Sequence, residues 1–149
     1  IQEPILAGYV FNKVSEIENE KIRVHYNFAV TTKRIEYISI FHLNEIIGIL
    51  LDNAKEAVEQ MEEARRNINF HIMETVDKLT IKVTNISEKI EQNRIIELFK
   101  EGYSSKENHS GLGLRKIKEL ADKYSYDIMP YNQVINNENH IVFEIVIYK

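Results

Sequence analysis

The 149-residue sequence contains no cysteine, and it has only two prolines and five glycines. The absence of cysteine excludes disulfide bonds, thiolate nucleophiles and cysteine-type zinc sites. The longest apolar stretch, IIGILL at 46–51, is far shorter than the roughly 20 residues of a membrane-spanning helix. The first residues lack the basic region that opens a signal peptide. Because the chain does not begin with Met, we expect it to be a piece of a longer protein.

Positive charge is also scarce, since 19 Lys and Arg residues stand against 23 Asp and Glu residues, for a formal net charge of -4. This balance argues against a broad nucleic-acid-binding surface, so we expect no nucleic-acid partner. Hydrophobic residues make up 44% of the chain and charged residues 28%, a composition typical of globular proteins. The length is that of one ordinary domain.

The spacing of apolar residues predicts helices alternating irregularly with strands. Helical spacing is found at 5–17, 42–63 and 113–124, and alternation typical of strands at 21–28, 67–74, 78–85, 126–133 and 140–149. The two middle strands are close enough to form an antiparallel hairpin. Residues 86–110 are polar and irregular, which is long for a connection inside a compact domain and typical of a lid or a disordered segment. This order favours an α+β sandwich with one sheet covered on one face.

The stretch HSGLGL at 109–114 places two glycines at the start of a predicted helix. Gly111 and Gly113 allow positive φ angles and let a ligand approach the backbone closely. The first N–H groups of a helix favour a phosphate or carboxylate, so the pattern can be a phosphate cradle. Alternatively, Ser110 is a helix N-cap and the glycines form an ordinary turn, because a lone G-x-G is weak evidence.

Polar residues interrupt the apolar pattern of the long predicted helix at LLDNAKEA, 50–57. Asn53 and Glu56 are three positions apart and share one face of the helix. Such residues usually form only the solvated edge of a core-facing helix. Here, however, the helical asparagine is followed by a strand that ends at Asn85 and by a long loop that ends in the glycine-rich helix start.

This order of motifs resembles the Bergerat ATP-binding fold of the GHKL superfamily, from about Ile22 to Tyr148. The resemblance is carried by LLDNAKEA as the N box, VTNISEKI (83–90) at the G1 position, IIELFKEGYSSK (95–106) as a lid, and GLGL as the G2 box. The lid and G2 box are similar to those of sensor histidine kinases. The N-terminal stretch PILAGYVFNKVSEIENEKIRV (4–24) is similar to the junction before the catalytic domain in Agr-type peptide-pheromone receptors.

The resemblance implies a two-layer α/β sandwich with a mostly antiparallel mixed sheet, helices on one face and an ATP lid. It implies that residues 1–20 are a helical junction and residues 21–149 the catalytic ATP-binding domain. Asn53 matches the Mg²⁺ ligand, Lys106 the lid lysine that neutralises phosphate charge, and Phe99 the apolar anchor of the lid. The implied nucleotide site comprises Asn53, Lys55, Glu56, Asn85, Phe99, Lys106, Gly111, Leu112, Gly113 and Leu114, with Asn53 and Lys106 taking part in catalysis.

The sequence departs from the superfamily pattern in the N box and the G1 box. Ile49 replaces the Asn, His or catalytic Glu that relatives carry one turn before the N-box asparagine. Asn85 replaces the aspartate that accepts the adenine amino proton, and ISEK (86–89) lacks the G1 glycines. Glu56 stands where many histidine kinases have a phosphate-binding lysine, with Lys55 one position away. These departures predict weaker ATP binding than in relatives with complete boxes.

The resemblance implies a protein histidine kinase domain that uses ATP and Mg²⁺. Its partners would be the upstream phosphoacceptor helices of the same homodimeric protein and a response regulator. The location would be the cytoplasmic side of a bacterial cell-membrane receptor for quorum sensing, with membrane attachment only through preceding segments. The five histidines lie outside any phosphoacceptor pattern, so we expect the acceptor to lie upstream. Two alternatives remain open: an anti-sigma-type serine kinase, and a degenerate module that binds partners.

Overall fold

A five-stranded mixed sheet forms one layer of the molecule in the computed structural model, which describes residues 1–99 and 112–149. The strand order is β1-β2-β3-β5-β4, and only the β1/β2 pair is parallel. The strands are β1 (Arg23–Ala29), β2 (Asn67–Glu74), β3 (Lys78–Ile86), β4 (Asp127–Ile135) and β5 (Glu138–Tyr148). Pro130 lies in β4, the outermost strand, where the lack of an N–H group is tolerated.

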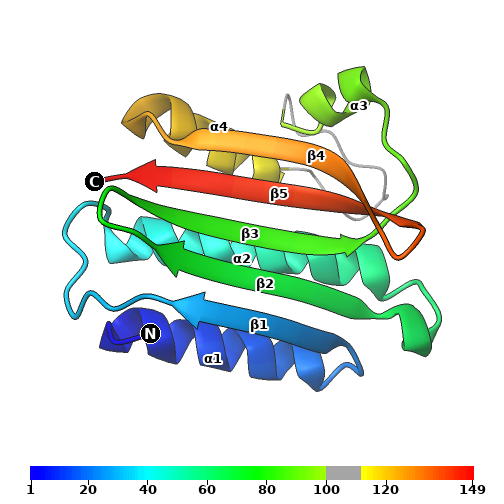
Figure 1. Cartoon of the computed structure of the whole chain (residues 1–149), viewed down its shortest axis with the longest axis horizontal. Coiled ribbons are helices and arrows are strands. Elements are labelled where there is room, and N and C mark those ends of the chain that lie inside the picture. The colour runs from blue at the N-terminus through cyan, green and yellow to red at the C-terminus, as the bar shows by residue number, and fades with distance from the viewer. Residues whose placement is uncertain (100–111) are drawn as a thin grey trace.

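Helices form the second layer, behind the sheet in Figure 1. They are α1 (Pro4–Glu18), α2 (Ile40–Val58) and α4 (Leu112–Tyr124), while the short α3 (Gln92–Glu97) lies near β4. Helix α1 packs against β1 and α2, and α2 also packs against β2 and β3. The Glu3 carboxylate caps α1 by accepting a hydrogen bond from the Leu6 amide at 2.5 Å.

The core lies between the two layers and follows the periodicity of the sequence. Alternate residues of the inner strands are fully buried, among them Phe70 on β2 and Ile81 on β3. Residues of α2 at helical spacing, such as Leu43, Ile47 and Leu50, are buried against them. Burial of apolar surface on both layers therefore fixes the helices to one face of the sheet.

The structure confirms the predicted fold class, and most predicted elements are found close to their expected positions. Two predictions were wrong in detail. The long helix ends at Val58 rather than near Glu63, because the chain turns there with the Met61 amide bonded to the Val58 carbonyl. The segment after β3 is not irregular throughout, since α3 forms and its Ile95 side chain is buried in the core.

A buried carboxylate at the end of β2 organises the loop between β1 and α2. The Glu74 side chain is 3% exposed and accepts hydrogen bonds from the amides of Thr31 and Thr32 at 3.1 and 3.0 Å. It also accepts bonds from the hydroxyls of Thr32 and Tyr37 and pairs with Lys149 at 3.2 Å. Burial alone would raise the pKa of Glu74, but the bonds from Thr32, Tyr37 and Lys149 lower it to about 2.

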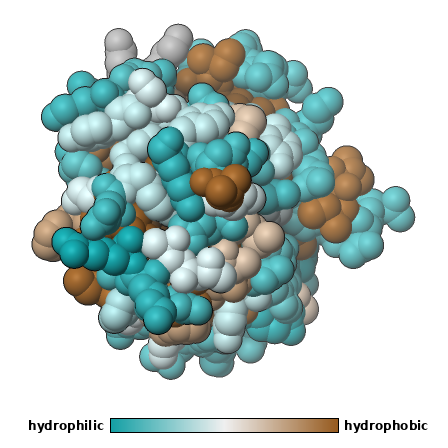
Figure 2. All heavy atoms as spheres, turned by 60° about the vertical axis from the view of Figure 1, so that its left-hand side comes forward, coloured by the Kyte–Doolittle hydropathy of each residue, from teal (hydrophilic) through white to brown (hydrophobic). Residues whose placement is uncertain are grey.

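Figure 2 brings this end of the sheet forward, and hydrophilic residues dominate the visible face. Hydrophobic residues on it are scattered rather than joined in one patch, as is usual for a monomeric surface.

The lowered pKa of Glu74 predicts an acid-dependent stability. Because the native pKa of about 2 lies below the ordinary value of 4.5, the stabilisation is complete above pH 4.5 and is lost as the pH falls toward 2. Glu74→Gln should lower the free energy of unfolding at pH 7 by about 2 kcal/mol and flatten its acid dependence. Urea unfolding at several pH values measures both effects. The exposed Glu36→Gln is the control, and an unchanged acid slope in Glu74→Gln would contradict the assignment.

Candidate nucleotide site

The N-box asparagine lies on α2, at the edge of the stripe that this helix buries. Asn53 is half-buried, whereas its neighbour Ala54 is 1% exposed and packs in the core. The apolar neighbours hold the helix against the sheet, so the amide of Asn53 is presented from a rigid element. An amide oxygen in this position is a suitable ligand for a hard cation such as Mg²⁺.

Helix α4 approaches α2 closely one turn before Asn53. A Cβ atom on Gly113 would lie 3.0 Å from the Cγ2 atom of Ile49, which leaves no comfortable room for a side chain. The His42 and Tyr124 rings meet at 5.3 Å near the other ends of the two helices, so α2 and α4 run antiparallel. The first described turn of α4 therefore lies beside the turn of α2 that leads to Asn53.

The rest of the predicted G2 box and lid is described only in part. Leu114 is buried at 5% exposure and fixes the first turn of α4 to the core. Leu112 is the first residue of α4. Gly111 and Lys106 were predicted to contact phosphate, and both lie outside the described residues. Their roles stay predictions.

Asn85 lies at the end of β3 with its side chain toward the helical layer. It is 1% exposed, and its Nδ2 atom donates a hydrogen bond to the Ile86 carbonyl at 2.9 Å. Val83, which lies two positions earlier on the same face of β3, belongs to the core. The amide of Asn85 is thus held in a fixed orientation at the position where the G1 aspartate is expected.

Phe99 is buried and packs edge to face on Phe143 of β5, with ring centroids 5.8 Å apart. Together with Ile95 it ties the chain after α3 to the helix-facing side of the sheet. This contact agrees with an anchoring side chain at the start of the predicted lid. The role of Phe99 in nucleotide binding itself stays a prediction.

Two charged residues, Lys55 and Glu56, follow Asn53 on α2. Lys55 pairs with Glu20, in the turn after α1, at 3.1 Å, and the hydrogen bond that Lys55 donates to the Glu20 carboxylate raises the pKa of Lys55. On the same side Lys13 pairs with Asp52 at 2.8 Å. Glu56 is half-buried on α2. Lys55 therefore takes part in the contacts that join α2 to α1 and the turn after it.

Tyr9 completes this junction, because a Cβ atom on Gly48 would collide with its hydroxyl group. Burial raises the pKa of Tyr9. Glycine at this position of α2 lets α1 pack closely alongside it, as small residues do at helix crossings. The sequence pattern predicted both helices but not this contact.

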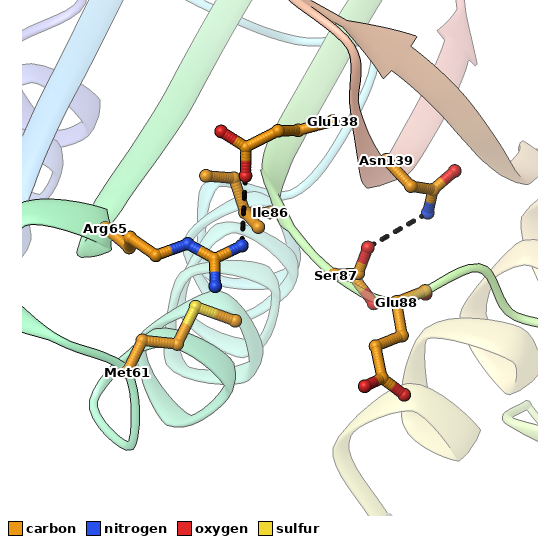
Figure 3. Close-up of a pocket in the computed structure, with 7 residues that line it drawn as sticks. All are labelled: Met61, Arg65, Ile86, Ser87, Glu88, Glu138 and Asn139. Carbon is orange, nitrogen blue, oxygen red and sulfur yellow. Dashed lines mark hydrogen bonds and ion pairs between the residues drawn. The ribbon is translucent and has the colours of Figure 1, made fainter.

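A pocket of about 400 Å³ lies at the end of the sheet beyond Asn85 (Figure 3). One wall is formed by the turn after α2 and the 3₁₀ helix η1 (Glu63–Arg65), and the other by the end of β3, the residues after it and the start of β5. The Arg65 guanidinium pairs with Glu138 across it at 2.9 Å. The lining residues are Met61, Arg65, Ile86, Ser87, Glu88, Glu138 and Asn139.

Two asparagines that the sequence reasoning missed hold the segment after β3. Asn132 of β4 bonds both the amide and the carbonyl of Ile90, and Asn139 of β5 donates to the Ser87 carbonyl. The available signal was an asparagine, a residue that strands disfavour, within or next to each of the last two predicted strands. Their partners are about 40 to 50 residues away, so spacing alone does not reveal them.

The residues that are brought together fit a magnesium nucleotide. Asn53 offers an amide oxygen, and the start of α4 offers backbone N–H groups one turn away, which suit a cation and a phosphate respectively. Within residues 1–99 and 112–149 there is no group of three His, Asp or Glu side chains placed to hold a metal.

Comparison with known proteins points to one family. A family model described as "GHKL domain" matches residues 38–148. The chain is 29% identical over 115 residues to the "Sensor protein CitS" of Bacillus subtilis, which covers 76% of this chain. The match spans about a fifth of the length of that protein, 21%. None of the helices among the described residues combines the length and the hydropathy that a membrane span requires.

Solved structures of histidine kinases have the same fold. The catalytic domain of histidine kinase ThkA superposes with a TM-score of 0.71 at 18% identity, covering 95% of this chain and 90% of that one. Full-length ShkA in complex with AMPPNP gives 0.74 at 11% identity, covering 98% of this chain and 30% of that one. The mycobacterial sensor histidine kinase MprB gives 0.70 at 12% identity, covering 97% and 92%.

The contact between Gly113 and Ile49 can be tested by unfolding. Gly113→Ala places a methyl group against Ile49 and should lower the free energy of unfolding by roughly 1 kcal/mol, and Ile49→Ala should relieve that cost in the double variant. Gly8→Ala is a matched control, because nothing lies within 4 Å of its Cβ position, and it should stabilise α1 by up to about 1 kcal/mol. Strict additivity of the two substitutions at 113 and 49 would contradict direct packing.

Proposed function

Because residues 38–148 match its model, the chain belongs to the GHKL domain family, and we propose that it is the ATP-binding catalytic domain of a sensor histidine kinase. The observation that carries the proposal is the contact of Gly113 with Ile49. With this contact the N-terminus of α4 lies one helical turn from Asn53, which supports a phosphate site next to a metal site. The nucleotide of this site would be ATP, and the similar ShkA structure is a complex with AMPPNP.

In this site Asn53 holds Mg²⁺ and the start of α4 binds phosphate oxygens through its N–H groups. When bound, Mg²⁺ neutralises the charge of the phosphates during transfer. Phe99 anchors the start of the lid, and Lys106, Gly111 and the backbone of Leu112 would complete the phosphate contacts. Asn85 faces the base end of the nucleotide, where its amide stands in for a carboxylate. Lys55 serves the site indirectly, because its partner is Glu20.

The acceptor of the phosphoryl group is a histidine on upstream dimerisation helices of the same protein, and a response regulator receives it next. The histidines of the described part do not form such an acceptor. His25, His71 and His140 lie in strands, and His42 packs on Tyr124 at the start of α2. Phosphoryl transfer needs little covalent help from the protein, so positioning and charge neutralisation are the main tasks of this domain.

A peptide-pheromone input and a place on the cytoplasmic side of a membrane receptor are the finer parts of the proposal. They are supported by the resemblance of residues 4–24 to the junction in Agr-type receptors. The name of the similar "Sensor protein CitS" supports sensing in general. An anti-sigma-type serine kinase is the alternative. It would lack upstream acceptor helices, so the residues that precede this domain in the full-length protein distinguish the two.

The test of the proposal is the binding of MgATP and its dependence on Asn53. Asn53→Ala removes a metal ligand without removing core packing, so MgATP affinity should fall at least about tenfold while thermal unfolding stays within a few degrees. Asn12→Ala, an exposed asparagine on α1, is the matched control. Titration calorimetry measures the MgATP affinity of both variants, and a thermal melt of each measures its unfolding temperature. In the full-length protein Asn53→Ala should abolish autophosphorylation, and normal activity there would remove Asn53 from the site.

The presence of Ile49 also leads to a prediction about ATP hydrolysis. Because Ile49 is packed on Gly113 and can neither accept nor orient a proton, the isolated domain should bind ATP but hydrolyse it extremely slowly. Turnover should appear only when acceptor helices bearing a histidine are supplied. A phosphate-release assay with and without these helices checks the expectation. Steady hydrolysis by the domain alone would argue for an ATPase rather than a kinase.

A further inference from the structure

Side-chain amides of the β4/β5 hairpin hold the backbone of the segment that follows β3. The Ile90 amide donates to Asn132 Oδ1 at 3.0 Å, and Asn132 Nδ2 donates to the Ile90 carbonyl at 2.7 Å. Asn139 Nδ2 donates to the Ser87 carbonyl and to Asn132 Oδ1, both at 3.1 Å. The Ser87 amide in turn donates to the Asn139 carbonyl at 3.0 Å.

The two asparagines act as one unit because of the strand register. Asn132 pairs with Ile141, so Asn139 is its diagonal neighbour on the same face of the hairpin. Figure 3 shows Asn139 pointing to Ser87 at the wall of the pocket. The segment thereby crosses the end of β5 and reaches the outer strand β4, where α3 begins two residues after Ile90.

This arrangement concerns the segment that occupies the G1 position. It starts directly after Asn85 and leads to α3 and the buried Phe99. Residues 86–90 contain no glycine, so the segment makes no use of the backbone freedom that glycine provides. Hydrogen bonds from outside the segment fix its path instead. Two backbone groups of Ile90 find their partners in one side chain.

We propose that Asn132 and Asn139 are positioning residues for nucleotide binding, which set the base-facing end of the site by holding residues 87–90. The inference rests on the proposed function, since the ligand concerned is the base of ATP. Asn132 carries both a donor and an acceptor, and the structure uses both on Ile90. Its replacement therefore frees the segment next to Asn85 without touching Asn53 or α4.

The expected effect is a loss of the binding affinity that comes from contacts with the base of the nucleotide. Asn132→Ala should weaken MgATP and MgADP by the same factor, about tenfold, because two hydrogen bonds to the segment are lost and the phosphate contacts are not. The preference for ATP over GTP should fall as well. Asn132→Asp keeps the acceptor for the Ile90 amide and loses the donor to its carbonyl, so its loss should be intermediate.

Gln133→Ala is the matched control, since it is the next residue of β4 and exposed. It should leave affinity and preference unchanged. Thermal unfolding of each variant separates a loosened site from a destabilised fold, and the isosteric Asn132→Asp keeps the test valid if Asn132→Ala folds poorly. Amide hydrogen exchange adds a local measurement. In Asn132→Ala the Ile90 amide should lose protection, while the Ser87 amide, bonded to the Asn139 backbone, should keep it.

The outcomes separate this inference from the function on which it rests. Weaker ATP and ADP binding with an unchanged unfolding temperature supports it. Unchanged affinity in Asn132→Ala, with the Ile90 amide exchanging freely, overturns it while the ATP site stands. A loss for ATP with ADP unaffected also overturns it, because the effect would then lie at the γ-phosphate. If the unmodified chain bound no MgATP, the proposed function would fail first and this inference with it.

Discussion

The close packing of α4 on α2 at Gly113 and Ile49 is the constraint on which the geometry of the site depends. Two helices that run antiparallel bring the start of one beside the middle of the other. Without a side chain at position 113 the start of α4 reaches the turn before Asn53. In the proposed site, Asn53 and the start of α4 can then serve one ligand, although about 60 residues separate them in the chain.

Charged contacts arrange the other side of the same helix. Asp52 and Lys55, on either side of Asn53, pair with Lys13 of α1 and with Glu20 in the turn after α1. These pairs are partly exposed and contribute little to stability one by one. Their effect is geometric, because they fix the rotation of α2 about its axis and with it the side from which Asn53 is presented.

Short-range patterns in the sequence predicted most of the fold. Alternation in 67–74 and 78–85 predicted the β2/β3 hairpin, and helical spacing predicted α1, α2 and α4, because each pattern reflects the burial of one face. Contacts distant in sequence were not predictable in this way. The partner of Lys55 and the bonds of Asn132 depend on how the sheet is assembled, and α3 depends on a place for Ile95 in the core. Asn53, Asn85 and Gly113 were identified as candidates by family resemblance, and their roles in binding stay predictions.

Pro130 bears on how this domain behaves among other copies of itself. It lies in β4, the outermost strand, and the outer edge of a sheet is where a foreign strand can add. A proline nitrogen has no hydrogen to donate, so a strand that approached this edge would find its ladder interrupted at that point. The same residue that the sheet tolerates only at its margin is therefore one that makes an edge strand a poorer template for a foreign strand.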